Sequence, residues 1–252
     1  MGFLGKLFEK KVCDICGAEI KLLGNRKLED GNLCKECALK LSPWFDERRN
    51  STVEQIAEQL KYREENKEKV AAFRTTRTLG DSTKVFMDED AGCFMVTSAR
   101  DLQKANPDVL AFSDVTGCIL DIEERRTELM KEGEDGKEIS YKPPRYVYEY
   151  DFYIAIQVRN PYFAEIRWKI NDSTVEVQQS MGMVNPQRNM EYCHYKQMGE
   201  EIKEAILQIH KQVREEKAAA AAPKKPVNCP CCGAQTTPDE RGCCEYCGSA
   251  LE

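Results

Sequence analysis

Four Cys-x-x-Cys pairs constrain this 252-residue chain more than any other feature of its sequence. Each pair presents two thiolates from one tight turn, and two such turns complete the tetrahedral four-sulfur shell that Zn²⁺ prefers. A closed shell leaves no position for an activated water, so these sites concern folding and binding surfaces rather than catalysis. The pairs predict two structural Zn²⁺ ions, with the ligands Cys13, Cys16, Cys34 and Cys37 at one and Cys229, Cys232, Cys244 and Cys247 at the other.

The two predicted zinc modules differ in the residues around their cysteines. In residues 12–45, Gly17 directly follows a pair, which suits a knuckle whose exit takes positive φ. The second pair there opens a short helical pattern, which predicts a treble-clef or LIM-like module. Residues 228–252 carry two Gly-terminated knuckles, the pattern of a zinc ribbon, and are too few to fold without metal. Cys231 and Cys243 lie beside these knuckles and remain alternative ligands.

The region between the modules changes its hydrophobic period from 3.6 to 2 residues. Residues 51–75 predict a helical spacer, with a capping box Ser51-x-x-Glu54 and a nearly all-charged, solvated stretch at 61–69. Residues 80–178 predict six or seven antiparallel strands, including one long strand at 146–158 that turns back through 162–170. A polar loop is expected at 130–144, and an amphipathic helix at 189–216.

The expected fold class is therefore an α+β multidomain chain. Residues 80–216 form an antiparallel β-barrel or sandwich capped by a C-terminal helix, an order that resembles the pleckstrin-homology-like fold. This architectural analogy carries no function with it. Residues 217–227, rich in Ala, Pro and Lys, are expected to be a linker that tethers the zinc ribbon.

Charge argues against a nucleic-acid binder. Residues 1–50 hold 10 Lys and Arg against 8 Asp and Glu, whereas residues 51–216 hold 23 against 31. A phosphate backbone needs several convergent cations, and the sequence shows no basic stripe. The best candidates for phosphate contacts are Arg26, Lys27, Arg48 and Arg49.

The sequence contains no apolar run near the roughly 20 residues of a spanning helix, and no secretory leader. We therefore expect a cytoplasmic protein, where thiols stay reduced. Residues 1–11 form an amphipathic leader with two interpretations, packing on the first zinc module or peripheral contact with a membrane. The residues that would enter the bilayer are Phe3, Leu4, Leu7 and Phe8.

The remaining cysteines and the two histidines do not form a recognisable catalytic set. Cys193 and His194 are neighbours on a predicted helix and point about 100° apart. His210 has no cysteine or carboxylate partner in sequence, and Cys93 and Cys118 fit as buried apolar fillers. No small-molecule substrate is predicted, and the chain is not expected to be an enzyme. Thiol redox chemistry is disfavoured because the Cys pairs come in twos.

The first 75 residues resemble an uncharacterised bacterial family described as a domain of unknown function. The resemblance rests on the two Cys-x-x-Cys pairs and on Ser51–Ile56 and Tyr62-Arg63. It implies metal binding and a bacterial cytoplasm. The predicted function is a non-catalytic zinc-binding adaptor or scaffold for an unidentified protein partner. The alternatives are a zinc-ribbon nucleic-acid-binding or transcription-regulatory protein and a thiol redox protein.

Overall fold

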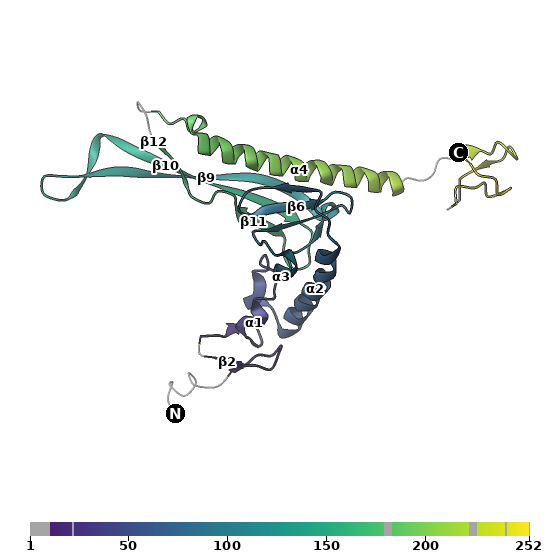
Figure 1. Cartoon of the computed structure of the whole chain (residues 1–252), viewed down its shortest axis with the longest axis horizontal. Coiled ribbons are helices and arrows are strands. Elements are labelled where there is room, and N and C mark those ends of the chain that lie inside the picture. The colour runs from purple at the N-terminus through teal and green to yellow at the C-terminus, as the bar shows by residue number, and fades with distance from the viewer. Residues whose placement is uncertain (1–10, 22, 179–182, 222–225, 240, 252) are drawn as a thin grey trace. The chain divides into compact units, whose positions relative to one another are not determined.

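A computed structural model describes residues 11–21, 23–178, 183–221, 226–239 and 241–251 (Figure 1). The chain divides into two compact units, the first ending at His210 and the second beginning at Lys211. Within the described residues, no helix is both long and apolar enough to cross a membrane.

The N-terminal part of the first unit is a small module of two hairpins and short helices. Strands β1 and β2 pair antiparallel, as do β3 and β4. Its core contains the fully buried Leu33 together with three of the four cysteines. The elements are β1 Lys11–Val12, β2 Glu19–Ile20, β3 Arg26–Lys27, β4 Asn32–Leu33, α1 Lys35–Ala38 and the 3-10 helix η2 Glu47–Asn50.

Helix α2, Val53–Ala72, packs its first half against this module, because Ile56 is fully buried in the same hydrophobic cluster. The capping box lies one residue later than predicted. Thr52 accepts from the backbone N–H of Gln55, and the Gln55 side chain accepts from the backbone N–H of Thr52. Ser51 instead donates to the carbonyl of Glu47 at 2.9 Å and closes η2.

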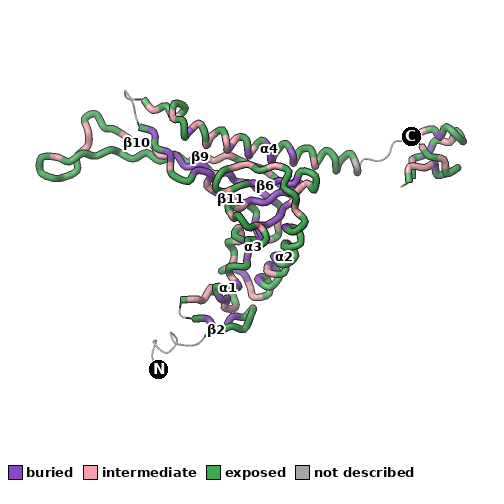
Figure 2. Tube along the Cα trace, in the orientation of Figure 1, coloured by how far each residue is buried: buried purple, intermediate pink, exposed green. Residues whose placement is uncertain are grey.

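The prediction of a solvated spacer at residues 61–69 is wrong for one face of α2. Arg63 and Asn66 are buried. In Figure 2, buried segments interrupt the exposed course of α2. Arg63 Nη1 lies 2.7 Å from Asp108 Oδ1, and Arg63 Nε donates to the carbonyl of Lys40 at 3.2 Å. Polar residues are buried here because each finds a partner.

Asn66 completes this buried polar network. Its Nδ2 donates to Asn106 Oδ1 at 2.8 Å and to the carbonyl of Pro107 at 2.7 Å, while its Oδ1 accepts from the Val109 N–H at 2.9 Å. Ser42 of the N-terminal module donates to Asp108 Oδ2 at 2.8 Å. The module, α2 and the loop before β8 therefore share one hydrogen-bonded interior.

The first of two four-stranded antiparallel sheets follows α2, in the order β5-β6-β7-β8. Val70 of α2 packs with Met95 and Val109 on one face of this sheet. Strands β6 and β7 form an antiparallel hairpin within the stretch where the sequence predicts antiparallel strands. The elements are β5 Arg77–Leu79, β6 Lys84–Asp88, β7 Cys93–Thr97, α3 Leu102–Ala105, β8 Leu110–Ala111 and the 3-10 helix η3 Phe112–Asp114.

The second sheet is built around one long strand, β10, as the alternation at 146–158 predicts. β9 pairs along one edge of β10, and β11 and β12 share the other edge. The predicted loop at 130–144 is wrong: β9 and β10 pair on both sides of a turn at 133–137, and the four residues 141–144 bulge out of the register between Ser140 and Arg145. The strands are β9 Val115–Glu132, β10 Glu138–Val158, β11 Glu165–Lys169 and β12 Val175–Gln178.

A closed barrel does not form among the described strands. The two-residue β8 ends at η3, which turns the chain before β9 begins, so no ladder joins β8 to β9. The fold is a mixed α/β arrangement of two antiparallel sheets with a four-cysteine group toward each end of the chain.

Helix α4, Met190–Ala221, follows the 3-10 helix η4, Pro186–Arg188. The Tyr192 ring meets those of Tyr150 and Phe152 edge-on at 4.9 and 5.1 Å, and Ile202 and Ile206 are fully buried, which confirms the predicted apolar stripe. The helix continues past residue 216 into the predicted linker, because the alanines there have the highest helix propensity.

Beyond α4, the second unit has little regular structure. Strands β13, Val227–Asn228, and β14, Gln235–Thr236, form a short antiparallel hairpin. Tight cysteine turns make up most of the rest of this unit.

Candidate metal centres

The N-terminal group brings together the sulfur atoms of Cys13, Cys16, Cys34 and Cys37, all within 4.8 Å of one another. The Sγ atoms of Cys16 and Cys34 are 3.7 Å apart. A tetrahedral zinc with Zn–S bonds of about 2.3 Å places its sulfurs about 3.8 Å apart. The four thiols therefore lie close enough together to hold one tetrahedral ion, and the donor set suits zinc.

The first pair of this group lies on a knuckle. Gly17 N–H donates to the carbonyl of Cys13 at 2.8 Å, Cys13 N–H donates to that of Ala18 at 2.9 Å, and Gly17 has φ +72°. An L side chain rarely adopts that φ, which explains the glycine.

The second pair lies on α1. Cys34 is the N-cap of this helix, and its Sγ accepts from the Cys37 N–H at 3.3 Å. Cys13 Sγ accepts from the Cys34 N–H, also at 3.3 Å. A knuckle facing a helix start is the arrangement that the sequence predicts for this module.

The thiols of this group have shifted pKa values. Burial raises the pKa of Cys13, but backbone N–H groups of Cys34, Cys16 and Ile15 outweigh burial and lower the pKa to about 6. Burial and the neighbouring thiols raise the pKa of Cys37. Close thiols cannot all ionise unless a cation compensates their charge, which is the electrostatic condition for a metal site.

The C-terminal group is made of two knuckles. The sulfur atoms of Cys229, Cys232, Cys244 and Cys247 lie within 4.8 Å of one another, with separations of 3.5 Å for Cys229 and Cys247 and 3.7 Å for Cys232 and Cys244. Gly233 and Gly248 each have φ +72° and donate at 2.8 Å to the carbonyl of the first cysteine of their pair. The same turn thus occurs three times in the described part of the chain.

Hydrogen bonds favour a thiolate at one corner of the second group. The Ser249 hydroxyl and backbone N–H lower the pKa of Cys247 to about 6, and Ser249 Oγ lies 3.3 Å from the sulfur. Cys244 and Cys229 are buried, whereas Cys232 and Cys247 are exposed. This group therefore shows one open side to solvent.

The alternative ligands lie outside both groups. Cys231 is exposed, and Cys243 forms an isolated bridge with Ala250, its Sγ 3.8 Å from the carbonyl of Arg241. The leader residues Phe3, Leu4, Leu7 and Phe8 lie outside the described residues.

The remaining candidate side chains are scattered. Cys193 Sγ donates to the carbonyl of Gln187, and the exposed His194 lies 3.4 Å from Asp81. His210 Nδ1 lies 2.7 Å from the carbonyl of Phe112. Cys118 is buried as predicted, but Cys93 is only half-buried.

Two aspartates have structural roles at the first site that the sequence does not predict. Asp14 Oδ2, inside the knuckle, accepts from the Asn32 N–H of β4 at 2.6 Å, and Asp30 Oδ1 accepts from the Val53 N–H at the start of α2 at 2.8 Å. Both contacts span about twenty residues, so no local signal marks them.

The geometry defines a class: a mixed α/β protein whose two four-cysteine groups are each arranged to hold one tetrahedral metal ion. Residues 11–59 match the family described as Domain of unknown function (DUF4428). No curated protein and no solved structure is significantly similar to the chain.

Proposed function

We propose that the chain is a non-catalytic zinc-binding adaptor of the bacterial cytoplasm, in which two zinc modules and a pleckstrin-homology-like domain present surfaces to a protein partner. The observation that carries this proposal is the closure of both cysteine groups. Four sulfurs at tetrahedral spacing occupy every position of a zinc ion and leave none for substrate or activated water. Zinc at such sites contributes folding energy rather than chemistry.

Close packing around the first group supports an adaptor role. The buried residues Arg63, Asn66 and Asp108 hold the N-terminal module against the sheet domain. The outer surface of the module is therefore rigidly held within the first unit. A rigid module loses little conformational entropy when a partner binds. In this proposal the leader adds a contact with the inner face of the membrane.

Thiol redox chemistry is the competing proposal. A disulfide needs sulfur atoms about 2.05 Å apart, and a redox-active pair works alone rather than inside a four-sulfur cluster. The 3.5–3.7 Å sulfur separations match metal ligation better than disulfide exchange.

Native mass spectrometry of the full chain, under reducing conditions without chelator, tests the proposal. We expect two zinc ions, falling to one in Cys34→Ser and to one in Cys244→Ser. Cys231→Ser is the matched control, because it removes an exposed thiol outside both groups and should keep two ions. A metal-free mass two or more hydrogens light, from disulfides, would contradict the proposal and favour redox chemistry.

A further inference from the structure

The N-terminal module carries a groove of about 650 Å³ between β3 and η2. The groove gathers two cation pairs that are more than twenty residues apart in sequence. Its lining contains one carboxylate, so the local charge is strongly positive even though the whole chain has a net charge of −6. The lining residues are Asn25, Arg26, Lys27, Leu28, Glu29, Arg48 and Arg49.

These four cations lack ion-pair partners among the described residues. Elsewhere in the same unit, Arg63 and Arg167 each hold a carboxylate at 2.7 Å. Cations that lie close together without forming ion pairs create a positive potential that attracts an anionic ligand.

Arg48 fixes the geometry of the groove. Its Nη1 donates to the carbonyl of Lys27 at 2.8 Å and so ties η2 to β3. Burial, together with the neighbouring charges of Arg49 and Arg26, lowers the pKa of Arg48. Guanidinium groups held this close repel one another, and a bound anion would remove that repulsion.

We propose that this groove binds a compact phosphate group with two or more negative charges. The half-buried Arg26 and Arg48 act as the fixed donors, and the exposed Lys27 and Arg49 close over the anion. The planar guanidinium fork matches phosphate oxygens two at a time, which explains three arginines among four cations. The phosphate is carried by a protein side chain or by a free small compound. This site goes beyond the adaptor role, because it names the chemical group that the N-terminal module would recognise.

A compact anion fits the groove better than a nucleic acid does. Double-stranded DNA carries one charge about every 1.7 Å and so needs cations along an extended track. Residues 51–216, which follow the module, hold 23 Lys and Arg against 31 Asp and Glu. Among the described residues, the groove lining also contains no aromatic ring on which a base could stack.

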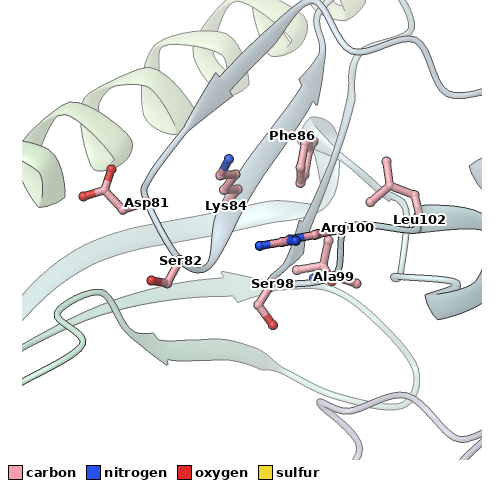
Figure 3. Close-up of a pocket in the computed structure, with 9 residues that line it drawn as sticks. Asp81, Ser82, Lys84, Phe86, Ser98, Ala99, Arg100 and Leu102 are labelled. Atoms are coloured by element: carbon pink, nitrogen blue, oxygen red, sulfur yellow. Dashed lines mark hydrogen bonds between the residues drawn. The ribbon is translucent and has the colours of Figure 1, made fainter.

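A second groove supplies the matched control. Lys84, Phe86 and Arg100 are among the residues that line a hollow of about 630 Å³ beside strands β6 and β7. Figure 3 draws these side chains. Removing these two cations changes the charge of the chain by the same amount as removing two from the first groove.

Isothermal titration calorimetry with pyrophosphate, on the full zinc-loaded chain at physiological salt, tests the site. We expect saturable one-to-one binding that weakens at least about tenfold in Lys27→Gln/Arg49→Gln, because two charged contacts are lost. Both side chains are exposed, so this variant should keep its fold and its two zinc ions. Lys84→Gln/Arg100→Gln should bind as the unmodified chain does.

Arg48→Lys keeps the charge but loses the fork, and should also weaken binding. Absence of saturable binding, or equal losses in the two double variants, would overturn the proposal. So would a single-stranded oligonucleotide that binds more tightly than pyrophosphate with a steep salt dependence. A phosphoserine peptide tighter than pyrophosphate assigns the phosphate to a protein partner, and the reverse order assigns it to a free compound.

Discussion

Replacing Arg63 with methionine should destabilise the first unit by about 3–5 kcal/mol, because it leaves a carboxylate unpaired in the interior. Arg63 Nη1 lies 2.7 Å from Asp108 Oδ1, and the two side chains are 6% and 1% exposed. At an effective dielectric constant of about 20, unit charges about 3 Å apart attract by about 5 kcal/mol. Ser42 would remain as the side-chain donor to Asp108. The carbonyls of Lys40 and Asn106 would lose their Arg63 donors.

The loss in Arg63→Met should depend on pH. Burial raises the pKa of Asp108, and the charge of Arg63 opposes that rise. Without Arg63 the pKa of Asp108 rises further, so the folded variant takes up a proton more readily than the unfolded chain does. The destabilisation is therefore fully present above that raised pKa and shrinks as the pH falls through it.

Urea unfolding followed by circular dichroism measures this effect on the zinc-loaded protein, at neutral pH and under mildly acidic conditions that retain the metal. Asp108→Asn completes a double-mutant cycle, because it removes the charge but keeps an acceptor for Ser42. Arg63→Met/Asp108→Asn should be more stable than Arg63→Met alone. The reasoning fails if Arg63→Met loses less than about 1 kcal/mol, or if the second substitution recovers nothing.

Three further predictions concern other parts of the chain. Gln59→Met should raise the free energy of unfolding by about 1–3 kcal/mol in a urea titration, because neither amide atom of this buried side chain has a partner among the described residues. Asn66→Leu, at an equally buried but fully hydrogen-bonded amide, should lower it instead. Gly31→Ala should destabilise the N-terminal module by about 1–3 kcal/mol, since a Cβ there would lie 2.5 Å from Val53 Cγ2, and Val53→Ala should restore part of the loss. Deleting residues 2–9 should reduce flotation with anionic liposomes if the leader contacts membranes, and unchanged flotation would exclude it as an anchor.

The metal sites and the apolar elements follow from short-range patterns in the sequence. Cys-x-x-Cys-Gly requires one particular turn, so Gly17, Gly233 and Gly248 could be placed before any coordinates. The apolar stripe through Ile202 and Ile206 reflects the one buried face of α4. The alternation around Ile154 likewise reflects the one buried face of β10.

The errors arise where structure depends on partners far away in sequence. Arg63 and Asn66 look like solvent-facing residues, and only the loop at Asn106–Asp108, some forty residues later, makes their burial favourable. The β9 and β10 segments beyond Leu129 lack the apolar alternation that marks a strand in sequence. They form a ladder through their backbone pairing with each other. The sequence already groups Arg26 with Arg48 as candidates for phosphate contacts, but their convergence on one groove depends on the fold of the module.

The family match ends at residue 59, in the middle of α2, yet the physical unit does not end there. A fragment cut at that point would separate Ile56, on the core of the metal module, from Arg63 and Asn66 on the same helix. The excised piece would end in a frayed half-helix, and the remainder would lose Ser42, whose hydroxyl donates to the buried Asp108. The stretch that matches the family is therefore shorter than the stretch that should fold alone, so a fragment built to hold the first metal ion should extend through the rest of α2 and the loop at Asn106–Asp108.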